Sequence, residues 1–261
     1  MIKHKENASA HLFAFHTPSL KQIAQTLAPG QLIHFKDVEL WHRIERVLRL
    51  KPQDAFILFD QHQHIECILR PETAEKKHII SAAISVVKQN EIPAPRITLG
   101  IGLVKRPTLH EIMYAATQMG VSSVIPLLTE KSQREWGGEK EYEKLHKTAI
   151  GAAEQSKNYV LPSMEKPLTV AEFIAQTRAK TVTSKLLYFE QGGLSFFQAL
   201  ADIHTTAYEE IVVVIGSEGG LTLSEQQLFD EGSYQKLALT PHVLRSIDAV
   251  VVALGAIRCS A

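Results

Sequence analysis

The residues best suited to chemistry in this chain form a glycine-rich segment, Gly216–Gly220, which reads GSEGG. It directly follows Ile211–Ile215 (IVVVI), a β-branched run typical of a strand buried on both faces. Glycines let a ligand approach the main chain, and the carboxylate of Glu218 could bind a hydroxyl or an amine. The alternative is a turn without a ligand, in which Glu218 caps the next helix. Thr222 and Glu225 already form a capping-box pattern, which makes that role less necessary.

Three further polar segments could contribute to the same site. Leu239–Ser246 (LTPHVLRS) joins a predicted strand to a predicted helix and contains Arg245, and Thr129–Arg134 (TEKSQR) follows another predicted strand. Ala152–Asn158 (AAEQSKN) ends a predicted helix and contains Glu154; a plain helix terminus is its alternative interpretation. Ligands of open α/β sheets bind at the carboxyl ends of the strands, so we expect all of these segments to meet at one sheet edge.

Hydrophobic periodicity predicts alternating strands and helices after residue 96. The predicted strands are 97–104, 121–128, 181–189, 211–215 and 236–240, and the predicted helices are 108–119, 139–156, 196–203, 224–231 and 244–258. Such alternation predicts an α/β fold with a mainly parallel sheet. Residues 1–75 instead predict a small β module, with strands near 56–59 and 65–69, a short helix at 41–50, and an exit through residues 71–78. The strand-like residues 79–89 are assigned to the second domain.

Composition excludes several classes of protein. The 261 residues carry 28 basic and 28 acidic side chains, so the net charge gives no support to a nucleic-acid partner. No apolar run approaches the roughly 18–20 residues that span a membrane, and no signal-peptide pattern begins the sequence. Cys67 and Cys259 are far apart, which indicates a reducing, cytoplasmic compartment and neither disulfides nor a metal site. Gly100 and Gly102 lie inside a predicted strand, which disfavours a dinucleotide fingerprint.

Five motifs in one order resemble the RsmE family of the SPOUT superfamily of RNA methyltransferases: TEKSQ, AAEQS, LLYFE, IGSEGG and LTPHVLRS. The N-terminal HFKDVELWHRIERVLRLKPQD also resembles that family's first domain, so the resemblance covers nearly the whole chain. It implies a PUA-like β-barrel RNA-binding domain over residues 1–75. It also implies a SPOUT-type parallel sheet with a C-terminal trefoil knot over residues 76–261, which periodicity could not show.

The resemblance further implies a cytoplasmic homodimer in ribosome biogenesis, with S-adenosyl-L-methionine as methyl donor and N3 of a uridine in 16S ribosomal RNA, or in the assembled small subunit, as acceptor. By motif match, the cofactor-binding residues would be Leu187, Tyr188, Phe189, Glu190, Ile215, Gly216, Ser217, Glu218, Gly219, Gly220, Leu239, Leu244 and Ser246. Basic residues that could bind RNA are Arg43, Arg46, Arg49, Lys105, Arg106 and Lys131; a solvated charged face is the alternative for each.

Two residues are candidates for catalysis. Arg245 could stabilise negative charge that develops on the uracil oxygens, and Glu154 could orient the substrate or accept its proton. The chain departs from the family pattern at Ser217, which stands in place of Pro, at Ile247–Asp248, where the family has Glu, and at Ala115 and Asn158, where the family has basic residues. Two alternatives therefore stay open: a catalytically weakened RNA-binding relative, and a different nucleotide-binding α/β enzyme.

Overall fold

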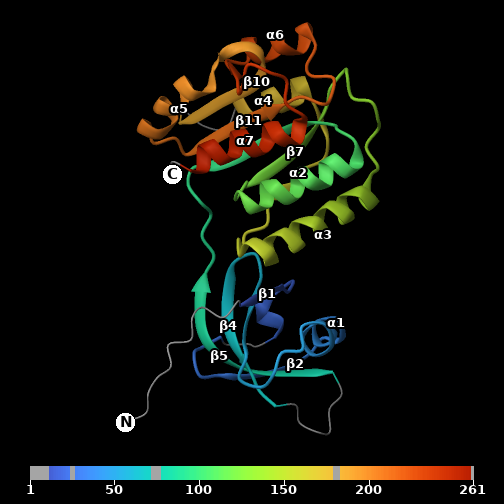
Figure 1. Ribbon diagram of the computed structural model, residues 1–261, viewed down its shortest axis with the longest axis vertical. Coiled ribbons are helices and arrows are strands. Elements are labelled where there is room, and N and C mark those ends of the chain that lie inside the picture. The colour runs from blue at the N-terminus through green and yellow to red at the C-terminus, as the bar shows by residue number, and fades with distance from the viewer. Residues whose placement is uncertain (1–11, 24–26, 72–77, 179–182, 260–261) are drawn as a thin grey trace. The chain divides into compact units, whose positions relative to one another are not determined.

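A computed structural model describes residues 12–23, 27–71, 78–178 and 183–259 of the chain. The chain divides into two compact units, residues 1–91 and 92–261 (Figure 1). Each unit has its own sheet, and the candidate site described below lies in the second.

The first unit, over its described residues, is built on a five-stranded sheet in the order β1-β3-β4-β5-β2. These strands are β1 (Phe13–His16), β2 (Leu32–Lys36), β3 (Ala55–Phe59), β4 (Gln63–Leu69) and β5 (Ile79–Gln89). β1 and β3 are parallel, whereas β3–β4, β4–β5 and β5–β2 are antiparallel. Helix α1 (Val38–His42) continues into the wider turn η2 (Arg43–Val47), and η1 (Leu20–Gln22) is a short 3-10 turn. Alternation along β4 buries Ile65, Cys67 and Leu69 against Phe15 and Phe56.

The position of β5 corrects the domain boundary predicted at residue 75. β5 hydrogen bonds with β4 along one side and with β2 along the other, so it belongs to the sheet of the first unit. The polar run that suggested an exit is therefore the connection between two neighbouring strands of one sheet, and its residues 72–77 lie outside the described residues. The boundary instead falls at Glu91, just before the Pro93-Ala94-Pro95 break.

The second unit confirms the predicted α/β fold with a mostly parallel sheet. Its described residues form a seven-stranded sheet in the order β12-β10-β11-β6-β7-β8, with β9 also paired to β7 and all pairings parallel. The strands are β6 (Arg96–Gly102), β7 (Ser123–Leu128), β8 (Ser163–Met164), β9 (Leu168–Thr169), β10 (Ser184–Ser195), β11 (Glu210–Ile215) and β12 (Gln235–Ala238). Ile211 through Ile215 are buried, as expected for a central parallel strand. Residues 181–182 of the predicted strand 181–189 lie outside the described residues.

Six helices accompany this sheet over the described part of the chain: α2 (Arg106–Gln118), α3 (Glu139–Ser156), α4 (Val170–Arg178), α5 (Phe196–Thr205), α6 (Leu223–Glu231) and α7 (Ser246–Arg258). α2 packs against α3 and α7, and α4 packs against α6 (Figure 1). The predicted capping box at α6 is present, with Thr222 and Glu225 each bonded to the other's backbone N–H. Within the described residues, none of the helices combines the length and the apolar character needed to span a membrane.

Candidate functional site

A cavity of about 380 Å³ lies at the carboxyl ends of β10, β11 and β12, and its volume is typical of a small-ligand site. Three chain segments form most of its wall: Phe189–Gln191 from β10, residues 215–220 after β11, and residues 238–247 after β12. Thr108 and Glu111 of α2 and Ala249 of α7 complete the lining. The cavity therefore brings together segments that are widely separated in the sequence.

Most of the residues expected to bind a cofactor line this cavity. They are Phe189, Glu190, Ile215, Gly216, Ser217, Glu218, Gly220, Leu239, Leu244 and Ser246. Leu187, Tyr188 and Gly219 lie outside the lining. Leu187 and Tyr188 belong to the core, where the Tyr188 hydroxyl donates to Asp230 at 2.7 Å and its ring stacks on Phe229. Burial and the Asp230 carboxylate raise the pKa of Tyr188, so its hydroxyl stays protonated.

The GSEGG segment forms a tight turn that needs glycine. Gly220 has a φ of +70°, and its N–H donates to the Ser217 carbonyl at 2.9 Å. Ser217 is buried, with 5% of its surface exposed. The neighbouring Leu221 N–H donates to Glu190 Oε2 at 3.2 Å, and Ser246 Oγ donates to the Gly216 carbonyl at 3.3 Å. Side chains from β10 and α7 thus hold the turn in place.

Gly102 at the end of β6 lies directly against this turn. A Cβ atom added at Gly102 would be 2.2 Å from the Ser217 nitrogen and 2.7 Å from the Gly216 carbonyl carbon. Gly100 and Gly102 do lie within β6, as expected, and Gly102 permits close backbone packing. A glycine inside a buried strand is the sequence feature that indicates such close backbone packing.

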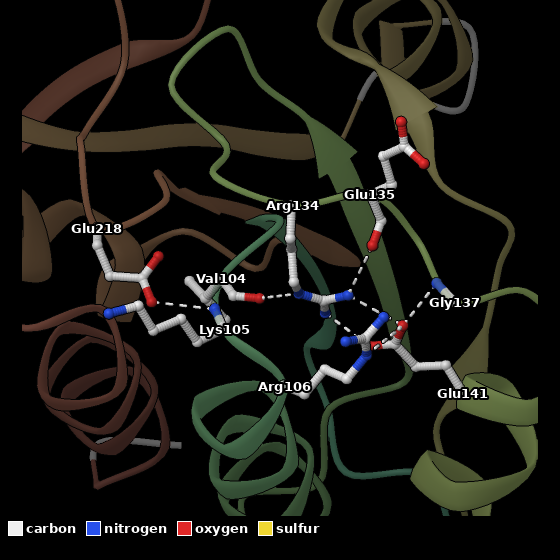
Figure 2. Close-up of polar contacts among 8 residues, drawn as sticks. All are labelled: Val104, Lys105, Arg106, Arg134, Glu135, Gly137, Glu141 and Glu218. Carbon is white, nitrogen blue, oxygen red and sulfur yellow. Dashed lines mark hydrogen bonds and ion pairs between the residues drawn. The ribbon is translucent and has the colours of Figure 1, made fainter.

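Glu218 caps a helix, although it is not the helix that follows it. Its Oε1 accepts a hydrogen bond from the Lys105 N–H at 3.0 Å, and α2 begins at Arg106 (Figure 2). A carboxylate at a helix N-terminus is favourable because of the helix dipole. Glu218 therefore both lines the cavity and binds the start of α2. The sequence predicted either a ligand contact or a cap of the following helix, but not a contact with α2.

Arg245 lies on the cavity wall at the start of α7. Its guanidinium makes two hydrogen bonds to the Asp248 carboxylate, of 2.8 and 3.0 Å. These bonds and the charge of Asp248 raise the pKa of Arg245, and the nearby charge of Glu111 adds to the effect. Hydrogen bonding from Arg245 likewise lowers the pKa of Asp248. Asp248 thus contacts Arg245 directly, next to Ile247, where the resemblance implies an acidic residue.

Several cavity residues were not anticipated from the sequence. Thr108 and Glu111 are three positions apart on α2, so they lie on the same helix face, and both line the cavity. Gln191 adds to the β10 segment of the wall, whereas Thr240, His242 and Val243 lie within Leu239–Ser246, a segment that the sequence already indicated as part of the site. No motif in the sequence marked Thr108 or Glu111, and only the packing of α2 beside α7 reveals their position.

Glu154 lies at the opposite edge of the sheet from the cavity. α2 and α3 run parallel, since Arg106 lies beside Glu141 at one end and Gln118 donates to Gln155 at 2.9 Å at the other. The expectation that Ala152–Asn158 joins the strand-end loops is therefore wrong. Helices in such units run antiparallel to the strands, so their C-termini lie at the amino edge, about 20 Å from the N-terminus of a 13-residue helix such as α2.

The proposed RNA-binding residues fall into two groups. In the first unit, the Arg43 guanidinium lies 4.8 Å from the Phe15 ring centroid and the Arg46 guanidinium 5.7 Å from that of Trp41. Arg49 is exposed and has a positive φ. In the second unit, Lys105, Arg106 and Lys131 are exposed. Lys131 also supports the GSEGG turn, because its Nζ donates to the Leu221 carbonyl at 3.1 Å and its side chain packs on Gly219.

Among the residues that the structure describes, no group of three or more His, Cys, Asp or Glu side chains is placed to hold a metal ion. Cys67 is buried, and burial raises its thiol pKa to about 12; Cys259 is exposed.

Comparison with known proteins shows that the second unit is an RNA methyltransferase domain. Residues 90–258 match the RNA methyltransferase domain family, which covers nearly all of the second unit. A solved structure, the ribosomal RNA small subunit methyltransferase E from Neisseria gonorrhoeae bound to S-adenosyl methionine, has the same fold, with a TM-score of 0.78 and 22% identity over 95% of this chain and 98% of that chain.

Curated relatives define the particular family. The ribosomal RNA small subunit methyltransferase E of Synechocystis sp. is 30% identical over 217 residues, which are 83% of this chain and 69% of the relative. That of Aquifex aeolicus is 26% identical over 85% of this chain and 92% of the relative. The chain therefore belongs to the RsmE family of RNA methyltransferases, as its ordered motifs predicted.

Proposed function

We propose that this protein transfers a methyl group from S-adenosyl-L-methionine to N3 of a uridine in 16S ribosomal RNA. The observation that carries the proposal is the cavity formed by Phe189–Gln191, the GSEGG turn and the segment 238–247, in a chain of the RsmE family. The relatives are named as small-subunit ribosomal RNA methyltransferases, which supports the same substrate class here.

The residues of the cavity fit the proposed methyl donor. Its volume is suited to a ligand of this class, and its wall combines apolar side chains with exposed main chain from the glycine turn. Glu111, Glu190 and Glu218 line it, and carboxylates suit both ribose hydroxyls and a cationic sulfonium group. The donor, when bound, supplies an electrophilic methyl group; the protein's own task is to position the base against it.

Arg245 is the residue we assign to the acceptor base. The uridine must be unpaired or extruded before its N3 can be reached, since that atom lies on the pairing edge. Loss of the N3 proton places negative charge on the uracil oxygens, and the Arg245 guanidinium at the cavity wall would stabilise it. Asp248 binds the planar guanidinium through two hydrogen bonds, in a pair whose side chains are 79% and 42% exposed.

The active form is proposed to be a homodimer in the cytoplasm, with a knotted second domain and a PUA-like RNA-binding first domain. Val243, Val251 and Val252 are exposed apolar residues beside or on α7, which supports a subunit contact at this face. A catalytic role for Glu154 then requires Glu154 of the partner subunit, because within one chain the residue lies at the other sheet edge. Sedimentation analysis of the wild type and of Val252→Glu tests the dimer, and a monomeric wild type would contradict it.

Arg245→Ala and Arg245→Lys test the catalytic assignment. Both variants should bind the methyl donor, but both should lose most methylation, because lysine cannot reproduce the bidentate pair with Asp248. Mass spectrometry of 16S RNA from a deletion strain complemented with each variant measures the methyluridine. Normal methylation by Arg245→Ala, with the dimer intact, would remove Arg245 from the mechanism.

A catalytically weakened RNA-binding relative is the second candidate. It is favoured by Ile247, which replaces an acidic residue of the family pattern, and by the distance of Glu154 from the cavity of its own chain. The same deletion strain distinguishes the two functions. An unchanged methyluridine content in the deletion strain would favour the binding-only protein.

A further inference from the structure

One peptide group near the cavity is held from both sides. Its N–H, that of Lys105, donates to Glu218 Oε1 at 3.0 Å, and its carbonyl, that of Val104, accepts a hydrogen bond from Arg134 Nε (Figure 2). Glu218 belongs to the GSEGG turn, whereas Arg134 belongs to the connection between β7 and α3. The orientation of this single peptide is therefore fixed jointly by two loops that are far apart in the sequence.

Arg134 is itself rigidly held. Its NH1 and NH2 groups donate to the two carboxylate oxygens of Glu141 at 2.9 and 2.6 Å, and NH1 also donates to the Glu135 carbonyl (Figure 2). The Glu141 side chain is 5% exposed and that of Arg134 is 13% exposed, so water competes little for these bonds.

Glu141 receives two further favourable contacts. The Gly137 N–H donates to its Oε2 at 2.7 Å, and Arg106 Nε lies 3.7 Å from the same atom. Burial raises the pKa of Glu141, but the hydrogen bonds from Arg134 and Gly137 and the charges of Arg134 and Arg106 outweigh it, so the pKa lies below its usual value. The carboxylate stays ionised at neutral pH and anchors Arg134.

We infer that Arg134, anchored by Glu141, is a positioning residue for the methyl donor: it fixes the Val104–Lys105 peptide and, through that peptide, the Glu218 carboxylate in the cavity wall. The inference rests on the proposed function. Arg134 is absent from the cavity lining, so its effect on the donor is transmitted by the backbone. The same peptide precedes α2, which carries Thr108 and Glu111 into the cavity wall.

A purely structural role for Arg134 is the competing explanation, and the chain offers a matched control. Arg258 also binds main-chain carbonyls, donating to Met119 at 2.9 Å, Gly120 at 2.8 Å and Pro95 at 2.9 Å. It does so at the C-terminal end of α2, away from Glu218. Replacing either arginine with lysine keeps the charge but removes the planar fork, so both variants should lose thermal stability. Only the Arg134 variant should lose affinity for the donor.

Calorimetric titration of the full-length protein with S-adenosylmethionine, with and without a small-subunit RNA fragment, tests the inference. Arg134→Lys should raise Kd by about five-fold or more, whereas Arg258→Lys should change it by less than about two-fold. In the Glu218→Gln background the Arg134→Lys substitution should cost little further affinity, because both residues act through one peptide. In steady-state methylation, the KM for S-adenosylmethionine should rise more than kcat falls.

The outcomes separate the inference from the proposed function. If the wild type binds no S-adenosylmethionine in either titration, the proposed function fails and the inference fails with it. If the wild type binds normally but Arg134→Lys binds equally well, or if the Arg134 and Glu218 effects simply multiply, the inference alone is overturned. Should Arg134→Lys fail to fold, Glu141→Gln replaces it in the same cycle, with a weaker donor affinity expected and an unchanged affinity contradicting the inference.

Discussion

Replacing Gly102 with alanine should disrupt the packing of β6 against the GSEGG turn. The added Cβ would lie 2.2 Å from the Ser217 nitrogen, 2.7 Å from the Gly216 carbonyl carbon and 3.0 Å from the Ser217 Cα. All three are backbone atoms, so no side-chain rotation relieves the overlap. Restoring ordinary contact requires the turn and β6 to separate by about 1 Å.

The expected magnitude follows from that displacement. Overpacking of a buried contact costs about 1–3 kcal/mol, and a cost of about 2 kcal/mol lowers the Tm of a unit of this size by about 4–8 °C. If the same strain disfavours the donor-binding conformation of the turn, Kd for S-adenosylmethionine rises by about 30-fold. Methylation falls further, because displacements of about 1 Å near a reacting centre can cost about 100-fold in rate.

Gly151→Ala is the matched control for Gly102→Ala. Gly151 lies within α3, and a Cβ added there meets no heavy atom within 4 Å. The control should stabilise the protein by about 1 kcal/mol through helix propensity and leave donor binding unchanged. Thermal unfolding and calorimetric titration of the three proteins provide the comparison. The reasoning is refuted if Gly102→Ala unfolds at the wild-type temperature and binds the donor with wild-type affinity.

Three further substitutions test individual interactions, two in the second unit and one in the first. Glu141→Gln should cost about 3 kcal/mol at neutral pH. Because the folded-state pKa of Glu141 is lowered, this difference from wild type should be full above about pH 4.3 and should shrink as the pH falls through the folded-state value, measured by urea unfolding at several pH values. Asp60→Ala removes the acceptor for three backbone N–H groups in the first unit and should cost about 3 kcal/mol there, read by hydrogen exchange of that unit; unchanged protection would contradict it. Thr222→Ala removes the α6 capping box and should cost about 1 kcal/mol in thermal unfolding, with Ser224→Ala expected to cost less.

Local sequence signals predicted the elements of the second unit well. Helix α3 has the predicted bounds, Glu139–Ser156, because its apolar residues recur at helical spacing and a glycine precedes it. The short elements β8, β9 and α4 were missed. Two-residue strands carry no periodicity, and the apolar positions of α4 gain their meaning from packing against α6 and β7.

Contacts between distant segments could not be predicted from one sequence. The polar run after Pro71 resembled a domain exit, yet it connects β4 to β5, and only strand pairing shows this. The Glu218–Lys105 contact joins residues 113 positions apart. Glu154 was expected at the carboxyl edge of the sheet because its motif resembles one of the family. Its position near the C-terminus of a helix instead predicts the amino edge, because helices of such units run antiparallel to the strands.

Three glutamates at or near the site accept hydrogen bonds from backbone N–H groups, a role that the sequence did not predict for Glu190 and predicted for Glu218 only at the following helix. Glu190 accepts from the Leu221 N–H, Glu218 from the Lys105 N–H, and Glu225 from the Glu130 N–H. Each carboxylate therefore holds a backbone segment in place, and two of the three, Glu190 and Glu218, also line the cavity. An amide in any of these positions keeps one acceptor oxygen but loses the charge that strengthens these bonds. The position of the main chain, rather than direct contact between carboxylate and ligand, is then the property most sensitive to such a change.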